Sequence, residues 1–332
     1  MNSNRGLRIF FPAAASLLFF AAILIGPAAA GVLAEDRAEN SATPLEGRWL
    51  LDFDRDDGRL QLSMERRAGS HNSQSSSSYR LEDFRDLRRP AGREDVPARF
   101  ALVRDAGTFS FEGHLDARGG AGRFQFSASP DFARAWNAAA RKQLSAEQLC
   151  SMALHDVSLV FLKDLRSLGY TDPSANKVIA MRIHGVTADE IRELQSLGYG
   201  KLSTDTLVSF RIHGVTPQMV RELSSQGYER IPPDQLVSMR IHGVTPEYVR
   251  AFASLGYRDV SPDSLVSMRI HGVNPEYVRD LSELGYRNVS VDDLVSMRIH
   301  GVTIDDIRKV QARERNVFVD ELVSRRIHSR SE

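Results

Sequence analysis

One nine-residue stretch returns along the second half of the chain at an almost fixed interval. The sequence LVSMRIHGV occurs at positions 236–244, 265–273 and 294–302, and with phenylalanine in place of methionine at 207–215. Its histidines are 29 residues apart from His155 to His300, and His328 follows after 28. A fixed period of this size is typical of repeat proteins, in which each unit packs on its neighbours.

Each unit carries the start and stop signals of two short helices. In the unit at 245–273, Thr245 followed by a proline suits one helix N-terminus, and Ser261 followed by a proline suits the second. Gly256 and Gly272 follow the two apolar segments, where glycine can adopt the left-handed conformation that ends a helix. We expect the second helix to bury four apolar side chains, namely Leu265, Val266, Met268 and Ile270.

We interpret the histidine–glycine pairs as helix ends. In a Schellman ending with Gly272 in the left-handed position, Val273 is expected to contact Met268. The preceding histidine then stands at the last helical position, where its ring can meet an unpaired carbonyl. The residues given this structural role are His184, Gly185, His213, Gly214, His242, Gly243, His271, Gly272, His300 and Gly301.

A row of metal-binding or catalytic histidines is the alternative. Helices of successive units pack about 10 Å apart, whereas zinc holds imidazole nitrogens at about 2 Å. Two histidines in successive units therefore cannot share a zinc ion, and we expect no metal or other cofactor. A pH-sensing row stays open, because aligned imidazoles titrate near neutrality. An unfolding midpoint that stays constant between mildly acidic and neutral pH would exclude it.

Two columns of arginine recur with the repeat. The first precedes the isoleucine–histidine pair and comprises Arg182, Arg211, Arg240, Arg269 and Arg298. The second lies in the first helix of each unit and comprises Arg192, Arg221, Arg250, Arg279 and Arg308. Repeated charges usually pair on a solvated surface. The expected partners are Asp205, Asp234, Asp263, Asp292, Glu193 and Glu222. The alternative is that both columns form a face that binds an anionic partner.

The ends of the array deviate from the repeat as terminal caps do. Asp156 replaces the glycine in the first histidine unit, and Ser329 replaces it in the last. Arg325 takes the position that methionine has elsewhere. Because a polar end keeps a final unit soluble, we expect the stack of repeats to end within this chain.

The first 46 residues differ in character from the rest. Arg5 and Arg8 precede an uncharged apolar run that extends to Ala34. This pattern predicts that residues 1–34 are a secretory signal peptide or a membrane anchor. Residues 35–46 are predicted to be a linker. In both cases the positive flank places the following residues outside the cytoplasm, so the protein is expected to be periplasmic, secreted or anchored to the inner membrane.

Residues 47–128 alternate between apolar and polar side chains with the period of a β-strand. Breaks at 54–58, 104–107 and 115–122 contain the Asp and Gly that tight turns require. The serine-rich stretch at 69–79 is predicted to be a flexible loop. The expected apolar face comprises Trp49, Leu51, Phe53, Leu60, Leu62, Met64, Phe100, Leu102, Phe109, Phe111, Phe124 and Phe126.

The predicted fold class is α+β. A small antiparallel β module, a sandwich or an open barrel, is expected to precede an α-solenoid of ~29-residue helix-turn-helix repeats at 129–332. Lys plus Arg and Asp plus Glu each total 43, so the formal net charge is zero. This balance argues against nucleic acid as a partner, because that affinity depends on excess positive charge. Cys150 is the single cysteine, which excludes an intramolecular disulfide.

Two stretches carry a resemblance to known proteins. LVSMRIHGVTPEYVRAFASLGY at 236–257 and FALVRDAGTFSFEGHLDARGGAGRFQF at 100–126 resemble a repeat-bearing extracytoplasmic region of bacterial envelope proteins. In some of these proteins the region follows a membrane-embedded zinc peptidase of the β-lactam-sensing BlaR type. The peptidase motif His-Glu-x-x-His does not occur in this sequence. The resemblance therefore implies an accessory or sensor-like part outside the cytoplasm and transfers no catalytic residue.

These patterns favour a non-catalytic interaction module whose partner is a protein or peptide of the cell envelope, with the N-terminal segment as its contact with the membrane. A sensor that binds a small ligand is the alternative. A hydrolase is less favoured, because the sequence has no nucleophile elbow, metal signature or phosphate-binding glycine loop. A purely structural spacer is a further possibility.

Overall fold

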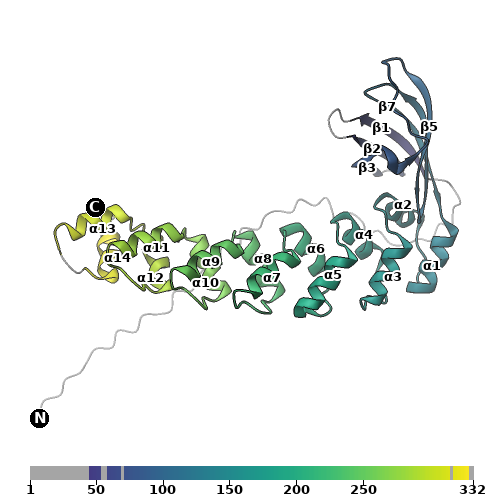
Figure 1. The fold of residues 1–332 in the computed structure, drawn as a ribbon. Coiled ribbons are helices and arrows are strands. Elements are labelled where there is room, and N and C mark those ends of the chain that lie inside the picture. The colour runs from purple at the N-terminus through teal and green to yellow at the C-terminus, as the bar shows by residue number, and fades with distance from the viewer. Residues whose placement is uncertain (1–44, 54–57, 69–70, 315–316, 329–332) are drawn as a thin grey trace, which may run out of the picture. The chain divides into compact units, whose positions relative to one another are not determined.

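The computed structural model describes residues 45–53, 58–68, 71–314 and 317–328, which belong to one compact unit. The predicted signal or anchor at 1–34 and nearly all of the predicted linker lie outside these residues. None of the helices in the described part of the chain combines the length and apolar character that crossing a bilayer requires. The described chain consists of a β module followed by helices, so the α+β class is confirmed (Figure 1).

The β module is a single curled antiparallel sheet (Figure 1). A short 3-10 turn, η1 (Leu81–Asp83), joins β3 to β4, which stand at opposite edges of the strand order β3-β2-β1-β7-β6-β5-β4. The rings of Tyr79 in β3 and Phe84 in β4 are nevertheless 5.4 Å apart, so the curl brings these edges close together. The strands are β1 Leu45–Phe53, β2 Arg59–Ala68, β3 His71–Arg80, β4 Phe84–Arg85, β5 Val96–Arg104, β6 Gly107–Leu115 and β7 Gly119–Ala128.

The concave side of the sheet holds the β-module core. All twelve side chains of the predicted apolar face are buried, which confirms the period-two interpretation. Phe100 and Phe111 stack with ring centroids 4.7 Å apart, and Trp49 meets Phe100 edge-on at 5.2 Å. The Trp49 indole N–H donates to the Arg123 carbonyl at 3.0 Å, so its polar atom is satisfied inside the core.

The prediction of a flexible loop at 69–79 was wrong. Residues 71–80 form strand β3, which pairs with β2 along its whole length. Ser76 shares hydrogen bonds with Ser63 at 2.9 Å and Gln61 at 2.8 Å, so the polar side chains of β3 meet polar side chains of β2. Low-complexity composition did not predict this strand, because the partner strand supplies both its backbone and its side-chain hydrogen bonds.

Fourteen α-helices follow in the described residues, mostly two per repeat. Each even-numbered helix from α2 to α12 contacts the next even-numbered helix, and each odd-numbered helix from α3 to α11 contacts the next odd-numbered one. A π-helical turn, η2 (Gln195–Tyr199), extends α5. The helices are α1 Pro130–Ala140, α2 Ala146–Leu154, α3 Leu159–Ser167, α4 Ala175–Ile183, α5 Ala188–Leu194, α6 Thr204–His213, α7 Pro217–Ser224, α8 Pro233–Ile241, α9 Pro246–Ser254, α10 Pro262–Ile270, α11 Pro275–Glu283, α12 Val291–Ile299, α13 Ile304–Gln311 and α14 Val319–His328.

Helices α2, α4, α8, α10 and α12 end with the Schellman hydrogen-bond pattern. The Val273 N–H donates to the Met268 carbonyl at 2.8 Å, and the Gly272 N–H donates to the Arg269 carbonyl at 3.2 Å. Gly272 has a φ of +73°, in the left-handed region where a side chain is strained. The same bonds recur one repeat earlier at Gly243 and one repeat later at Gly301.

The isoleucine before each histidine is exposed, which contradicts the expectation that Ile270 belongs to the buried face. Leu265 and Met268 are buried, whereas Ile270 stands two residues beyond Met268, about 200° further around the helix. It therefore points away from the core. The five isoleucines at this position have between 49% and 56% of their surface exposed: Ile183, Ile212, Ile241, Ile270 and Ile299.

A row of tyrosine hydrogen bonds connects each repeat to the next. The tyrosine that follows the first-helix glycine donates its phenol O–H to a backbone carbonyl just before the even-numbered helix of the following repeat. The pairs are Tyr170 with Leu202 (2.6 Å), Tyr199 with Ile231 (2.8 Å), Tyr228 with Val260 (2.8 Å), Tyr257 with Val289 (2.7 Å) and Tyr286 with Val317 (2.8 Å). Each bond satisfies a polar atom at a contact between units.

We expect the protein to lose stability at alkaline pH because of two buried phenols, those of Tyr248 and Tyr277. Each donates to the carbonyl of the valine that ends its repeat, Val273 at 2.8 Å and Val302 at 3.0 Å. Burial raises the pKa of both phenols to about 12, above the usual value near 10. Because the raised pKa favours the neutral phenol in the folded state, this stabilisation is complete below pH ~10 and is lost between pH ~10 and ~12.

We expect the free energy of unfolding to fall by about 1 kcal/mol per tyrosine near pH ~11. Denaturant titrations from neutral to alkaline pH measure this fall, and Tyr248→Phe together with Tyr277→Phe should reduce it. If the free energy of unfolding of the double variant falls as steeply with pH as that of the wild type, the assignment to these phenols is contradicted.

Candidate functional site

The first arginine column lies on the even-numbered helices, directly before the exposed isoleucines. Its side chains reach back to the preceding repeat, where the Arg211 Nε–H donates to the His184 carbonyl at 3.2 Å. The Nε–H of Arg182 donates in the same way to His155, and that of Arg240 to His213, both at 3.4 Å. These arginines supply a donor and a positive charge to the C-terminal end of a neighbouring helix.

Four of the five guanidinium groups also contact the residue 21 positions earlier, in the first helix of the same repeat. Arg211 forms an ion pair with Glu190 at 2.6 Å. For Arg240 this residue is Met219, whereas Arg269 lies 5.0 Å from the ring centroid of Tyr248 and Arg298 lies 5.0 Å from that of Tyr277. Within the described residues, no carboxylate lies within 4 Å of Arg240, Arg269 or Arg298, whose positive charges therefore have no close counter-ion.

The second arginine column lies on the odd-numbered helices and is largely paired with acidic side chains. Arg192 contacts Asp164 of the preceding repeat at 2.8 Å and also Asp189. Arg221 contacts Glu193. The remaining pairs are Arg279 with Glu276 at 3.9 Å and Arg308 with Asp305 at 3.3 Å. Arg250 lies near Glu247, whose pKa is lowered by hydrogen bonds from its own backbone amide and from Thr245, and by the Arg250 charge.

The aspartates near the start of the even-numbered helices contact side chains other than the first arginine column. Asp205 forms an ion pair with Lys177 at 2.9 Å, and Asp263 accepts a hydrogen bond from Gln235 at 3.2 Å. In the described chain these aspartates form no ion pair with the first arginine column. The first column and this acidic column therefore do not neutralise each other.

The histidine row lies beside the isoleucines on the same helix ends. His184, His213, His242 and His271 are exposed, and His300 is partly exposed. His155 in the first repeat differs, because burial and the charge of Arg182 lower its pKa. In the part of the chain that the structure describes, no group of three or more His, Cys, Asp or Glu side chains could hold a metal ion.

The isoleucines are the surface residues that sequence reasoning missed. Their apolar character within a helical segment predicts a core position, which the structure contradicts. The spacing in the sequence predicts exposure instead, since a residue two positions from a buried methionine faces the other side of a helix. The exposed isoleucines thus recur once per repeat on the even-numbered helices.

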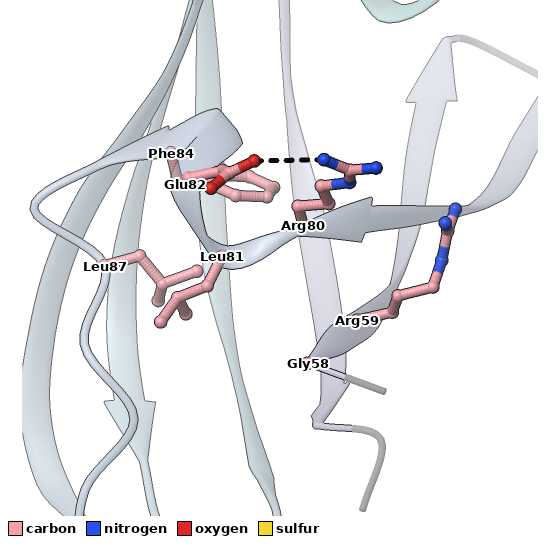
Figure 2. Close-up of a pocket in the computed structure, with 7 residues that line it drawn as sticks. All are labelled: Gly58, Arg59, Arg80, Leu81, Glu82, Phe84 and Leu87. Carbon is pink, nitrogen blue, oxygen red and sulfur yellow. Dashed lines mark hydrogen bonds and ion pairs between the residues drawn. The ribbon is translucent and has the colours of Figure 1, made fainter. Parts of the chain in front are cut away.

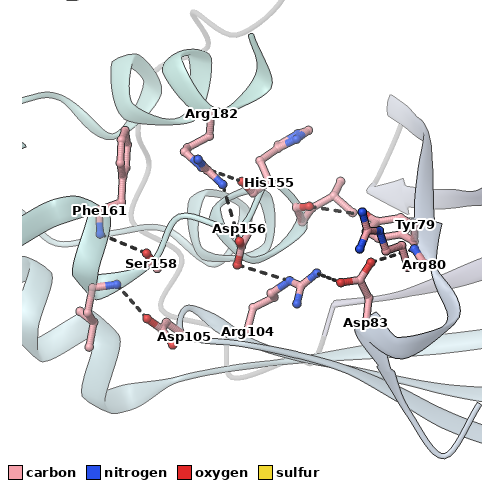
Figure 3. Close-up of polar contacts among 12 residues, drawn as sticks. Tyr79, Arg80, Asp83, Arg104, Asp105, His155, Asp156, Ser158, Phe161 and Arg182 are labelled. Atoms are coloured by element: carbon pink, nitrogen blue, oxygen red, sulfur yellow. Dashed lines mark hydrogen bonds and ion pairs between the residues drawn. The ribbon is translucent and has the colours of Figure 1, made fainter. Parts of the chain in front are cut away.

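The β module and the helices are joined by a chain of ion pairs (Figure 3). Arg104 of β5 lies between Asp83, at 3.6 Å, and Asp156, at 3.4 Å. Asp156 in turn lies 3.6 Å from Arg182 of α4. Asp156 has a φ of +54°, in the position that later repeats give to glycine. It therefore accepts an unfavourable backbone conformation and connects β5 to α4 through its carboxylate.

Asp156→Asn is expected to lower the free energy of unfolding by about 0.5 to 1.5 kcal/mol at low salt, and by less at high salt. The asparagine tolerates a left-handed backbone but loses both ion pairs. Asp156→Gly is the matched control, because it also loses the pairs but relieves the backbone strain. Urea unfolding at two salt concentrations measures the effect. Equal midpoints for the wild type and Asp156→Asn at low salt would contradict it.

A hollow of about 650 Å³ lies near the edge of the curled sheet (Figure 2). Arg59 and Arg80 face each other across β2 and β3, and apolar side chains of η1, β4 and the following loop complete the lining. Arg59 donates to Ser78 at 3.0 Å, and Arg80 pairs with Glu82 at 3.3 Å. Two arginines, one glutamate and three apolar side chains therefore line the hollow.

Comparison of the chain with protein-family models and with curated proteins found no match.

Proposed function

We propose that the helical region is an α-solenoid that binds a segment of a protein or peptide in the bacterial cell envelope, without catalysis. Stacked repeats whose units contact only their neighbours present long continuous surfaces. The succession of contacts from α2 to α14 and from α3 to α13 supports this architecture.

The observation that carries the proposal is the row of exposed isoleucines. Ile183, Ile212, Ile241, Ile270 and Ile299 occupy the same position on helices that contact one another in succession. Each isoleucine exposes about half of its surface, and burial of that surface would favour binding by roughly 25 cal/mol for each Å² removed from water.

The place of action in this proposal follows from the N-terminal sequence. An uncharged apolar run after Arg5 and Arg8 suits export across the inner membrane or retention in it. The repeats would then meet partners outside the cytoplasm.

Site-specific photo-crosslinking of the full chain in native envelopes tests the proposal. A photoreactive residue at Ile241 reports on the isoleucine row, and one at Arg250 reports on the odd-numbered helices. Leu50, which is exposed on the outer side of the sheet, is the control position. We expect adducts from the helical region and none from Leu50. Absence of adducts from both helical positions would exclude a binding role for the repeats.

A second candidate is a sensor that binds a small anion in the hollow of the β module. The size of the hollow supports it, because about 650 Å³ falls within the range of roughly 300–1,000 Å³ that is usual for small-molecule sites. Deletion of the N-terminal apolar run should then abolish signalling but leave ligand binding intact. Anion titration calorimetry that shows no heat with the full chain would exclude this role.

A further inference from the structure

The exposed isoleucines and the first arginine column are neighbours in sequence on the even-numbered helices, and we call the set the isoleucine ridge. It comprises Ile183, Ile212, Ile241, Ile270 and Ile299 with the arginine that precedes each of them. The even-numbered helices that carry these residues contact one another from α4 to α12. The ridge therefore repeats an apolar side chain and a positive charge at the spacing of packed helices, about 10 Å.

Among the described residues, the last three arginines of the ridge lack a close carboxylate. Arg182 has Asp156 as a close carboxylate and Arg211 has Glu190, but the described residues provide none within 4 Å of Arg240, Arg269 and Arg298. The arginines of the second column, in contrast, lie beside carboxylates such as Asp164 and Glu276. An acidic partner would therefore gain most in the repeats from α8 to α12.

The first repeat shows how such a surface is covered. Leu154 and His155 occupy the positions of the ridge isoleucine and histidine, and both are partly buried there. The Tyr79 phenol of β3 donates a long hydrogen bond of 3.5 Å to the Leu154 carbonyl (Figure 3). The Asp156 carboxylate lies beside the arginine of the next repeat. An aromatic side chain and a carboxylate thus occupy the first position of the row.

Later repeats lack both of these groups. Glycine stands at the Asp156 position, and the guanidinium lies against it, with the Arg298 terminal nitrogen 3.3 Å from where a Gly272 side chain would begin. The carboxylate and the large side chain that cover the first repeat would have to come from another molecule. A second copy of this chain is disfavoured, because facing ridges would bring two arginine rows together.

We propose that the isoleucine ridge binds an acidic peptide segment in an extended conformation, with one apolar side chain on each isoleucine and carboxylates beside Arg240, Arg269 and Arg298. Three residues of a polyproline II helix span about 9 Å, close to the spacing of the repeats. Every third residue can then be apolar and a neighbour acidic. This inference rests on the proposed function and names the chemistry of the partner.

Fluorescence anisotropy with a labelled peptide of Pro-Ile-Glu triplets, one for each ridge isoleucine, tests the inference on the full chain. Binding is expected to weaken by about tenfold in Ile241→Ser with Ile270→Ser, and by about tenfold in Arg240→Gln with Arg269→Gln. The matched control is Arg250→Gln with Arg279→Gln, which should bind like the wild type. Circular dichroism checks that every variant is folded.

Two further peptides separate charge from apolar contact. A peptide with lysine in place of glutamate, and one with serine in place of isoleucine, are both expected to bind at least about tenfold more weakly. The inference is overturned if the lysine peptide binds equally well, if the ridge variants bind like the wild type, or if only a helical acidic peptide binds. Self-association that the isoleucine variants abolish would instead identify a second copy as the occupant and also overturn it.

Failure of this inference is distinguishable from failure of the proposed function. If the ridge variants still give adducts from position 250 in native envelopes while the triplet peptide does not bind, another face of the repeats binds the partner. If neither helical position gives adducts, the binding role itself is excluded.

Discussion

Alanine in place of Met268 is expected to lower the free energy of unfolding by about 2–5 kcal/mol, because its side chain is 0% exposed and packs at the Schellman end of α10. Ile270→Ala, two residues away in the same helix, is expected to cost only about 0.5 kcal/mol, since that side chain is 55% exposed. Urea unfolding followed by circular dichroism measures both changes.

The pair is informative because the two substitutions remove similar apolar groups from one helix. Alanine raises the helix propensity by only a few tenths of a kcal/mol at either position, and somewhat more for the β-branched isoleucine, so a difference of several kcal/mol reports burial. Equal losses at the two positions would show that Ile270, not only Met268, belongs to the core. That result would also remove the apolar part of the isoleucine ridge, which makes this measurement a direct check on the proposed surface.

Local chemistry explains what could be predicted from the sequence. Serine, threonine and proline at helix starts and glycine at helix ends act within one turn, so Thr245 accepts the Tyr248 N–H and Gly272 adopts a left-handed backbone without help from distant residues. The apolar face of the β module is equally local, since alternation along one strand already separates Trp49 from Leu50.

The features that were missed depend on partners far away in the sequence. Strand β3 has few apolar side chains and is stabilised by its pairing with β2. The arginines of the first column contact residues 21 or more positions earlier in the sequence. The repeat period alone does not determine which recurring side chains come into contact. Arg269 was expected to pair with an aspartate column, whereas its guanidinium lies over the ring of Tyr248.

The deviation at Asp156 shows how a repeat is adapted at a boundary. Later repeats have glycine at this position, where the backbone is left-handed. Aspartate is tolerated in that conformation better than most residues, and its carboxylate meets Arg104 of β5. The sequence marked this residue as atypical, but only the fold explains it, since Arg104 is 52 residues away in the chain.

Trp49→Ala is expected to lower the free energy of unfolding by about 3–5 kcal/mol. Trp49 is 2% exposed, contacts Phe100 and Phe111, and donates its indole N–H to the Arg123 carbonyl. Leu50→Ala is the matched control, because this neighbour lies on the other side of the same strand with 53% exposure and should cost about 0.5 kcal/mol.

The same variant tests how far the helices depend on the β module. Helix α2 contacts β1, β5, β6 and β7, whereas the later helices contact mainly their neighbours in the repeats. Because stability in a repeat array passes between nearest neighbours, Trp49→Ala should increase amide hydrogen exchange in the β module and α2 but leave α9 to α12 protected. Hydrogen exchange with mass spectrometry resolves these segments. Uniform loss of protection through α12 would instead mean that the sheet and the repeats unfold as a single cooperative unit.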